Sequence, residues 1–89
     1  MTKPPKEICL KALNKPSFPK KATMKTHYWE ETITRPKTPK GNWGVLASEI
    51  YGNPHGPTEH NTIKALNELV TEGKVTMFYY NNYFWYAKA

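Results

Sequence analysis

A run of aromatic residues near the C-terminus, interrupted by two asparagines, constrains the fold of this chain most. Residues 75–89 read VTMFYYNNYFWYAKA, and the segments on both sides of the asparagines are typical of β-strands. Asparagine tolerates the positive φ angles that a two-residue hairpin turn requires. A turn at residues 81–82 therefore predicts a β-hairpin in which Tyr80 faces Tyr83 and the outer pairs follow in antiparallel order.

The predicted hairpin is apolar on both faces, because side chains alternate between the faces of a strand. One face carries Val75, Met77, Tyr79, Phe84 and Tyr86. The other face carries Phe78, Tyr80, Tyr83 and Trp85. The first can cover helices, and the second then needs its own partner. Three interpretations of the second face stay open: packing on the N-terminal segment, contact with a second copy or another protein, and stacking of single-stranded bases.

Two helices are predicted before the hairpin. Leu46, Ala47 and Ile50 within residues 43–52 (WGVLASEIYG) predict a short amphipathic helix ended by Gly52, and residues 53–56 (NPHG) predict a turn. Residues 57–72 form a longer helix that Pro-Thr opens and Gly73 follows. The apolar side of this helix consists of Ile63, Leu66, Leu69 and Val70, with Thr62 and Ala65 at its edges.

The first forty residues are less regular. Residues 6–14 (KEICLKALN) predict a short helix, and residues 15–25 are expected to be irregular and basic. Residues 26–34 (THYWEETIT) are compatible with a helix by their spacing and with a strand by their threonines. Residues 35–42 (RPKTPKGN) predict a basic linker, since two prolines oppose regular structure there.

Charge divides the chain into two segments. Residues 1–40 hold ten of the thirteen basic residues, three acidic residues and six of the eight prolines, which gives a net charge of +7. Residues 41–89 carry a net charge of −1. An anionic partner is therefore expected to meet the front segment first. The division predicts a basic N-terminal segment, 1–40, and a structured core, 41–89, unless the front supplies a first helix and strand to the same domain.

Composition excludes several classes of protein. No apolar run approaches eighteen residues, so no membrane span is expected. The start of the chain lacks the pattern of a secretory signal. Cys9 is the only cysteine and cannot form an internal disulfide, which fits a reducing compartment, cytoplasmic or nucleoid-associated. Its thiol is expected to be a small buried apolar group.

The order of short helix, turn, longer helix, glycine and hairpin resembles the winged helix-turn-helix family. The resemblance rests on residues 46–52 (LASEIYG) and 61–75 (NTIKALNELVTEGKV), which fit a T-[VI]-x-x-A-L-x-x-L core with a closing G-x-V. It covers residues 43–89. It implies an α+β fold, a small winged helix-turn-helix domain with a C-terminal β-hairpin wing and a basic N-terminal extension. In this family the second helix usually enters the DNA major groove, and the wing touches the backbone or minor groove.

Carried over by position, the resemblance implies a recognition face on the longer helix. That face consists of Thr58, His60, Asn61, Lys64 and Asn67. Asparagine can bond an adenine edge, lysine can reach guanine acceptors, and threonine and histidine can bond phosphate. Two features depart from the family, because the helix has three acids against one lysine and the wing tip has no cation. The cations would come from Lys11, Lys15, Lys20, Lys21, Lys25, Arg35, Lys37 and Lys40.

Residues 35–41 (RPKTPKG) allow two interpretations. Extended Arg/Lys-Pro segments can enter an A·T-rich minor groove, and Arg35, Lys37 and Lys40 would then contact DNA. A solvated linker is the ordinary interpretation, because the Gly-Arg-Pro centre of such segments is missing here.

No catalytic or metal-binding pattern stands out. His55 and His60 are five residues apart, whereas a metal site on one helix face needs a spacing of three or four. His27 has no evident partner. Neither a nucleophile–histidine pair nor a glycine-rich phosphate loop is present. No enzyme activity, cofactor or metal is therefore predicted.

Two functional hypotheses follow. The first is a small protein that binds double-stranded DNA, a transcriptional regulator, in which helix 57–72 reads the duplex and the basic front supplies phosphate contacts. The alternative is a protein-interaction module on the same fold, acting on a transcription or replication complex or as a homodimer, with no DNA binding of its own. Binding to RNA or single strands is a third option.

Overall fold

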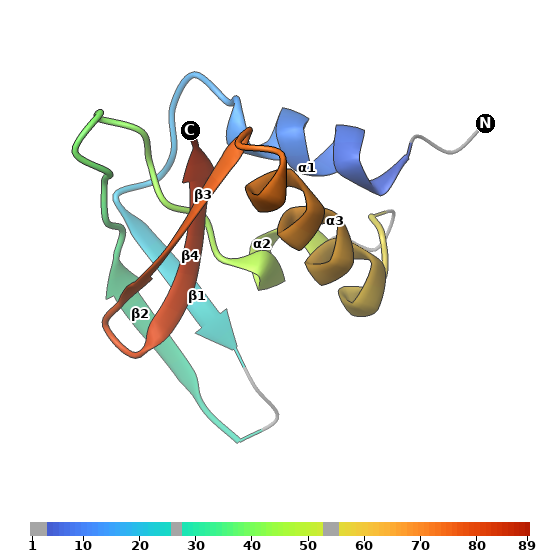
Figure 1. Ribbon diagram of the computed structural model, residues 1–89. Coiled ribbons are helices and arrows are strands. Elements are labelled where there is room, and N and C mark those ends of the chain that lie inside the picture. Colours follow the sequence, from blue (N-terminus) through green and yellow to red (C-terminus); the bar gives the residue numbers. More distant parts are fainter. Residues whose placement is uncertain (1–3, 26–27, 53–55) are drawn as a thin grey trace.

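The computed structural model describes residues 4–25, 28–52 and 56–89, which form three helices and four strands (Figure 1). The helices are α1 (Pro5–Leu13), α2 (Ala47–Tyr51) and α3 (Glu59–Thr71). The strands are β1 (Lys21–Lys25), β2 (Glu30–Thr34), β3 (Val75–Tyr80) and β4 (Tyr83–Lys88). They pair as two antiparallel hairpins, β1–β2 and β3–β4. No helix in this part of the chain is long and apolar enough to span a bilayer. The α+β prediction is confirmed at this level.

The C-terminal hairpin has the predicted register. Tyr80 pairs with Tyr83, and the pairing continues outward to Val75 and Lys88. Asn81 and Asn82 occupy the two-residue turn with φ angles of 51° and 72°. These positive values are those that a tight hairpin turn needs, and asparagine adopts them at low cost.

Helix α3 has the expected end signals. The Thr58 hydroxyl accepts a hydrogen bond of 3.2 Å from the Asn61 amide, which caps the first turn. Gly73, just past the other end, has a φ of +76°, a conformation that favours glycine. The short helix predicted within residues 43–52 is also present, as α2. Of the turn predicted at 53–56, residues 53–55 lie outside the described ranges.

The front segment contains a hairpin that the sequence did not predict. The expectation of irregular structure for residues 15–25 is wrong at 21–25, which form β1, and the open choice at 26–34 resolves to a strand, β2, over 30–34. Ala22 faces Ile33 across this hairpin, and both are buried. With one strongly buried residue in each five-residue strand, the apolar alternation was too sparse to recognise.

The segment just before α2 joins the C-terminal hairpin by one isolated bridge, which we call the bridge strand. Val45 bridges Tyr86 through two main-chain hydrogen bonds of 2.7 and 2.9 Å, immediately before α2 begins. The bridge lies on the edge of β4 that faces away from β3. It attaches the start of α2 to the hairpin, and residues of α2, α3 and the hairpin pack together in one core.

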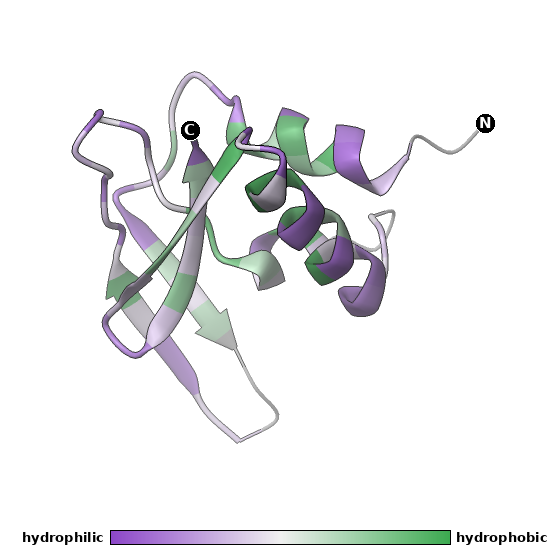
Figure 2. Ribbon diagram, in the orientation of Figure 1, coloured by the Kyte–Doolittle hydropathy of each residue, from purple (hydrophilic) through white to green (hydrophobic). Residues whose placement is uncertain are grey.

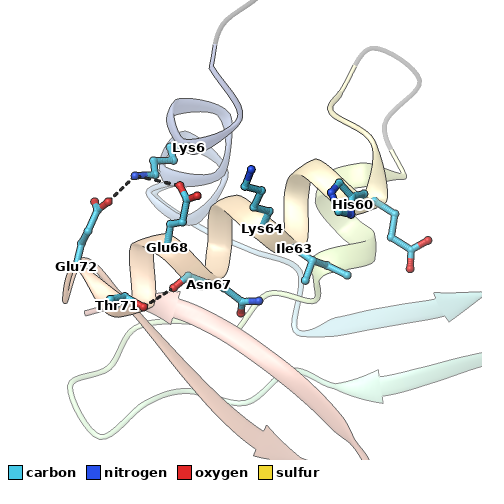
Figure 3. A pocket seen from close by; sticks show the side chains of 9 residues that line it. Lys6, His60, Ile63, Lys64, Asn67, Glu68, Thr71 and Glu72 are labelled. Carbon is cyan, nitrogen blue, oxygen red and sulfur yellow. Dashed lines mark hydrogen bonds and ion pairs between the residues drawn. The ribbon is translucent and has the colours of Figure 1, made fainter.

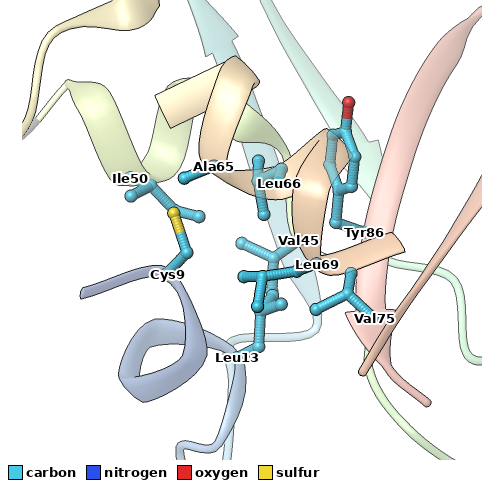
Figure 4. Close-up of a cluster of buried hydrophobic side chains, with 9 residues drawn as sticks. All are labelled: Cys9, Leu13, Val45, Ile50, Ala65, Leu66, Leu69, Val75 and Tyr86. Carbon is cyan, nitrogen blue, oxygen red and sulfur yellow. The ribbon is translucent and has the colours of Figure 1, made fainter. Parts of the chain in front are cut away.

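The main core lies where α1, α3 and the C-terminal hairpin meet (Figure 4). Leu66 and Leu69 of α3 pack with Cys9 of α1 and Tyr86 of β4, and all four are buried. Hydropathy follows this arrangement along α3, where polar segments alternate with apolar ones that turn toward the core (Figure 2). The prediction that Cys9 is a buried apolar group is confirmed.

A second core lies between the two hairpins. It consists of Ala22, Ile33, Leu46 and Trp85. The Trp85 indole is fully buried and donates a hydrogen bond of 2.9 Å to the Tyr80 carbonyl. Since residues from 1–40 and from 41–89 contribute to both cores, the front segment is an integral part of the fold and residue 40 lies in an internal loop.

Candidate nucleic-acid interface

Helix α3 turns a mostly polar face away from the core, interrupted by Ile63, which was predicted on the apolar side but is exposed. Its buried positions are Thr62, Ala65, Leu66 and Leu69. The residues predicted to read DNA lie on the other sides: Thr58, His60, Asn61, Lys64 and Asn67 are all exposed. The Thr58 hydroxyl is engaged in the helix cap, so its side chain has less capacity for an external partner.

The outward face of α3 borders an open groove of about 840 Å³ (Figure 3). His60, Lys64 and Asn67 line it along the helix, and Ile63 adds an apolar position. Lys6, from α1, closes one side. The groove therefore offers a histidine, an amide and a lysine head group to a ligand that lies along the helix, beside three carboxylates, Glu59, Glu68 and Glu72.

Two acids at the C-terminal end of α3, Glu68 and Glu72, are held in ion pairs, which the sequence did not reveal. The Lys6 ammonium contacts both Glu68, at 3.2 Å, and Glu72, and Lys74 lies 3.5 Å from Glu72 (Figure 3 draws the Lys6 contacts). The hydrogen bond between Lys6 and Glu72 raises the pKa of the lysine and lowers the pKa of the carboxyl. Two of the three acids on this helix are thus paired, which removes much of the repulsion that the sequence implied toward phosphate.

Arg35 is not available to DNA, which corrects the sequence-based assignment. Its side chain is 2% exposed and bonds both carboxylate oxygens of Glu49. It also donates to the carbonyl oxygens of Gly44, at 2.8 Å, and Pro19, at 2.9 Å, and its guanidinium lies 5.2 Å from the Phe18 ring centroid. Arg35 is a structural link between β2 and α2.

Lys37 and Lys40, the other predicted front contacts, are exposed. The Lys37 ammonium lies 4.3 Å from the centroid of the Trp43 ring. The loop that carries both lysines is anchored to the end of β4, since the side-chain amide of Asn42 donates a 2.8 Å hydrogen bond to the Lys88 main-chain carbonyl.

Two lysines that were not predicted as contacts, Lys74 and Lys88, belong to the same end of the molecule. The Ala89 amide donates to the Lys74 carbonyl at 3.3 Å, which places the two ends of the hairpin side by side. We call Lys37, Lys40, Lys74 and Lys88 the strand-end lysines; all are exposed. Because Lys74 follows the last turn of α3, these cations continue from the C-terminal end of that helix.

The aromatic face proposed for interactions is largely covered. The β1–β2 hairpin packs on it and buries Trp85 completely. Phe78 and Tyr83 are half-buried, and the Tyr83 hydroxyl donates a 2.7 Å hydrogen bond to Glu31. Of the four predicted residues only Tyr80 is well exposed. The interpretation in which this face packs on the N-terminal segment is the one that the structure supports.

The other face of the C-terminal hairpin, which carries Met77, Tyr79 and Phe84, is exposed except at the end of the hairpin that packs on α3. Val75 and Tyr86 pack on α3, whereas Met77, Tyr79 and Phe84 are 43%, 62% and 56% exposed. The Tyr79 and Phe84 rings meet edge to face with centroids 5.2 Å apart. The alternation in sequence could not reveal this, because α3 is long enough to cover only the base of the hairpin.

Among the described residues no cluster of three or more potential metal ligands occurs. His27 and His55, which were considered as ligands, lie outside the described ranges. The chain matches no known protein family, no curated protein and no solved structure. Its functional interpretation therefore rests on its own geometry and charge.

Proposed function

We propose that this chain binds duplex DNA as a small winged-helix protein, with the outward face of α3 in the major groove. The observation that carries the proposal is that the outward face of α3 exposes Lys64 and Asn67, while Glu68 and Glu72 are held in ion pairs with Lys6. Lysine and asparagine at successive turns of one helix suit the acceptors of guanine and the paired donor and acceptor of adenine.

The arrangement of elements supports this proposal. A helix, a short bridge strand at Val45, a helix pair and a hairpin follow each other in the order that winged-helix domains use. The β1–β2 hairpin, between α1 and Val45, would be an insertion in that order. It packs on the hairpin face turned away from α3, so it leaves the proposed DNA face open.

Phosphate contacts would come from the strand-end lysines. They extend from the C-terminal end of α3, and no acid other than Glu72 is in an ion pair with any of them among the described residues. A duplex on α3 would then be held by electrostatic contacts at one end of the helix and read by side chains along it.

The test is fluorescence anisotropy of the full-length chain with random duplex DNA across a salt series. The front segment cannot be deleted for this purpose, because it supplies Cys9, Leu13 and Ile33 to the cores. Substitution is the better probe. The double variants Lys37→Gln/Lys40→Gln and Lys74→Gln/Lys88→Gln should each make the negative slope of the logarithm of the binding constant against log salt shallower by roughly 1–2.

A matched control is Lys15→Gln/Lys21→Gln, which removes the same charge from a separate groove bordered by α2. This double variant should leave the salt slope closer to that of the parent protein. If the parent chain shows no binding even at low salt, or if all three double variants behave alike, the proposed surface is wrong.

One observation favours the alternative of a protein-interaction module. Met77, Tyr79 and Phe84 form an exposed apolar surface on the hairpin, of the kind that marks protein contacts. A chain that fails to bind duplex DNA, yet loses capture of a defined protein partner on Tyr79→Ser, would support this second function.

A further inference from the structure

Strand β3 has an unprotected outer edge. It pairs with β4 on one side only, and within the described part of the chain no other strand borders it. Natural proteins usually protect such edges with charged residues or proline. β3 reads VTMFYY and has neither, whereas β1, β2 and β4 contain Lys21, Glu30 and Lys88 among their charged residues.

The bridge between Val45 and Tyr86 shows which main-chain groups of β3 point outward. Tyr86 gives both its amide and its carbonyl to Val45, so it cannot exchange these bonds with its neighbour Met77. In an antiparallel pair, hydrogen-bonded and non-hydrogen-bonded residues alternate. The amides and carbonyls of Val75, Met77 and Tyr79 therefore face the free edge, while those of Phe78 and Tyr80 face β4.

The same residues carry the exposed apolar side chains. Met77 and Tyr79 lie on the uncovered hairpin face beside Phe84. The edge thus combines unpaired main-chain groups with apolar side chains in one place. Among the described residues, no main-chain hydrogen bond reaches this edge of Met77 or Tyr79.

We propose that β3 pairs antiparallel with β3 of a second copy of this chain, which joins the two C-terminal hairpins into one continuous sheet. A pairing centred on Phe78 sets Met77 of each copy opposite Tyr79 of the other, so the outward amides and carbonyls of Met77 and Tyr79 exchange hydrogen bonds in reciprocal pairs. Methionine sulfur against an aromatic ring is a favourable contact.

The reciprocal pairing of Met77 with Tyr79 points to a second copy as the occupant, because the edge of β3 is complementary to itself. The protein has a net charge of +6, so two copies join most readily along a surface that brings no like charges together. β3 is uncharged throughout, and the antiparallel pairing places Lys74 of one copy opposite Asn82 of the other. No like charges meet along the joined strands. The proposal is independent of DNA binding; if both hold, the two α3 helices are related by a two-fold axis and an inverted-repeat site is expected.

The test is sedimentation velocity of the full chain over a concentration series. The parent protein should shift from its monomer mass of 10.3 kDa toward twice that value as concentration rises. Tyr79→Lys, which adds a charge at the exposed edge, should raise the dissociation constant at least tenfold. The matched control is Thr32→Lys, which adds the same charge at an exposed position of β2.

Amide hydrogen exchange on the parent protein gives a second readout that needs no variant. The Phe78 and Tyr80 amides, bonded to β4, should be protected at every concentration, whereas the Met77 and Tyr79 amides should become protected only as the dimer forms. A parent chain that stays monomeric to millimolar concentration would overturn the proposal. So would equal dimerisation of the two lysine variants, or exchange at Met77 and Tyr79 that does not change with concentration.

Discussion

Arg35 and Glu49 join the end of β2 to α2 through a bidentate ion pair, with distances of 2.7 Å from Nη2 to Oε1 and 2.9 Å from Nη1 to Oε2. The arginine is almost completely buried, and the Glu49 carboxylate also accepts the Leu46 amide at 2.8 Å at the start of α2. The pair therefore holds the front hairpin, the helix pair and the bridge strand in one arrangement.

Arg35→Ala should destabilise the protein by about 3 kcal/mol, because it leaves Glu49 and two carbonyl oxygens without their donor. Urea unfolding followed by circular dichroism measures the change. The control is Lys37→Ala, which removes an exposed cation on the Trp43 ring and should cost less than about 1 kcal/mol. Equal losses for the two variants would contradict a structural role specific to Arg35.

Thr62→Val should leave stability unchanged or raise it by up to about 1 kcal/mol. The Thr62 hydroxyl is fully buried in α3, and its oxygen has no hydrogen-bond partner among the described residues. Valine has nearly the same shape and removes the buried polar group. Thr71→Val is the control, since that hydroxyl is exposed and donates to the Asn67 carbonyl at 3.1 Å. A clear loss of stability in Thr62→Val would show that the hydroxyl is hydrogen-bonded in solution.

The sequence predicted those parts of the fold whose signals are local. Asn81 and Asn82 determine the hairpin register by their own backbone preference, and Thr58 with Gly73 marks the ends of α3. Contacts between distant residues could not be predicted in this way. Lys6 and Glu72 are 66 residues apart, so the pairing of the acids on α3 depends on how α1 packs.

The same limit applies to the candidate site. His60, Lys64 and Asn67 were found because they lie opposite an apolar helical stripe. Arg35 was assigned to DNA because extended Arg/Lys-Pro segments can enter a minor groove, and only the fold brings Glu49 to it. The exposed face of the C-terminal hairpin could not be predicted either, because the β1–β2 hairpin that covers its other face was not recognised in the sequence.

The buried thiol of Cys9 should make stability fall at alkaline pH. Burial raises the pKa of the thiol above its ordinary value of 9.0. Above pH 9 the unfolded chain therefore releases this proton while the folded chain retains it, so unfolding is favoured as pH rises. Burial raises the pKa of Tyr86 as well, which acts in the same direction from about pH 10.0.

Two measurements check this prediction. The urea midpoint should decrease between pH 8.5 and pH 10.5, within the window that the ordinary thiol pKa of 9.0 defines. In the native state at pH 8, a disulfide reagent should modify Cys9 at least a hundredfold more slowly than in denaturant, because the thiol is inaccessible. Rapid native modification would contradict the burial of Cys9 in the core.

If α3 reads DNA as proposed, Lys64→Ala and Asn67→Ala should each weaken binding to a selected site by roughly 1–3 kcal/mol. The effect on random duplex should be smaller for Asn67, whose expected contact is to a base edge. Competition anisotropy with a site selected from a random pool provides the measurement, with Thr32→Ala on the other hairpin as control. No loss of affinity in either α3 variant would refute the role given to this helix.

Lys6→Gln should weaken binding to random duplex DNA more than Lys11→Gln does, although both remove one positive charge from α1. The difference arises because Lys6 also pairs Glu68 and Glu72, and its loss leaves Glu68 without an ion pair and Glu72 with Lys74 alone beside the proposed DNA face. Lys11, the matched control, is in none of the ion pairs formed by the described residues. Anisotropy at low salt should show a several-fold greater loss for Lys6→Gln, and the difference should diminish at high salt as the carboxylates are screened. Equal losses would mean that α3 lies away from the phosphates, and that the strand-end lysines act without it.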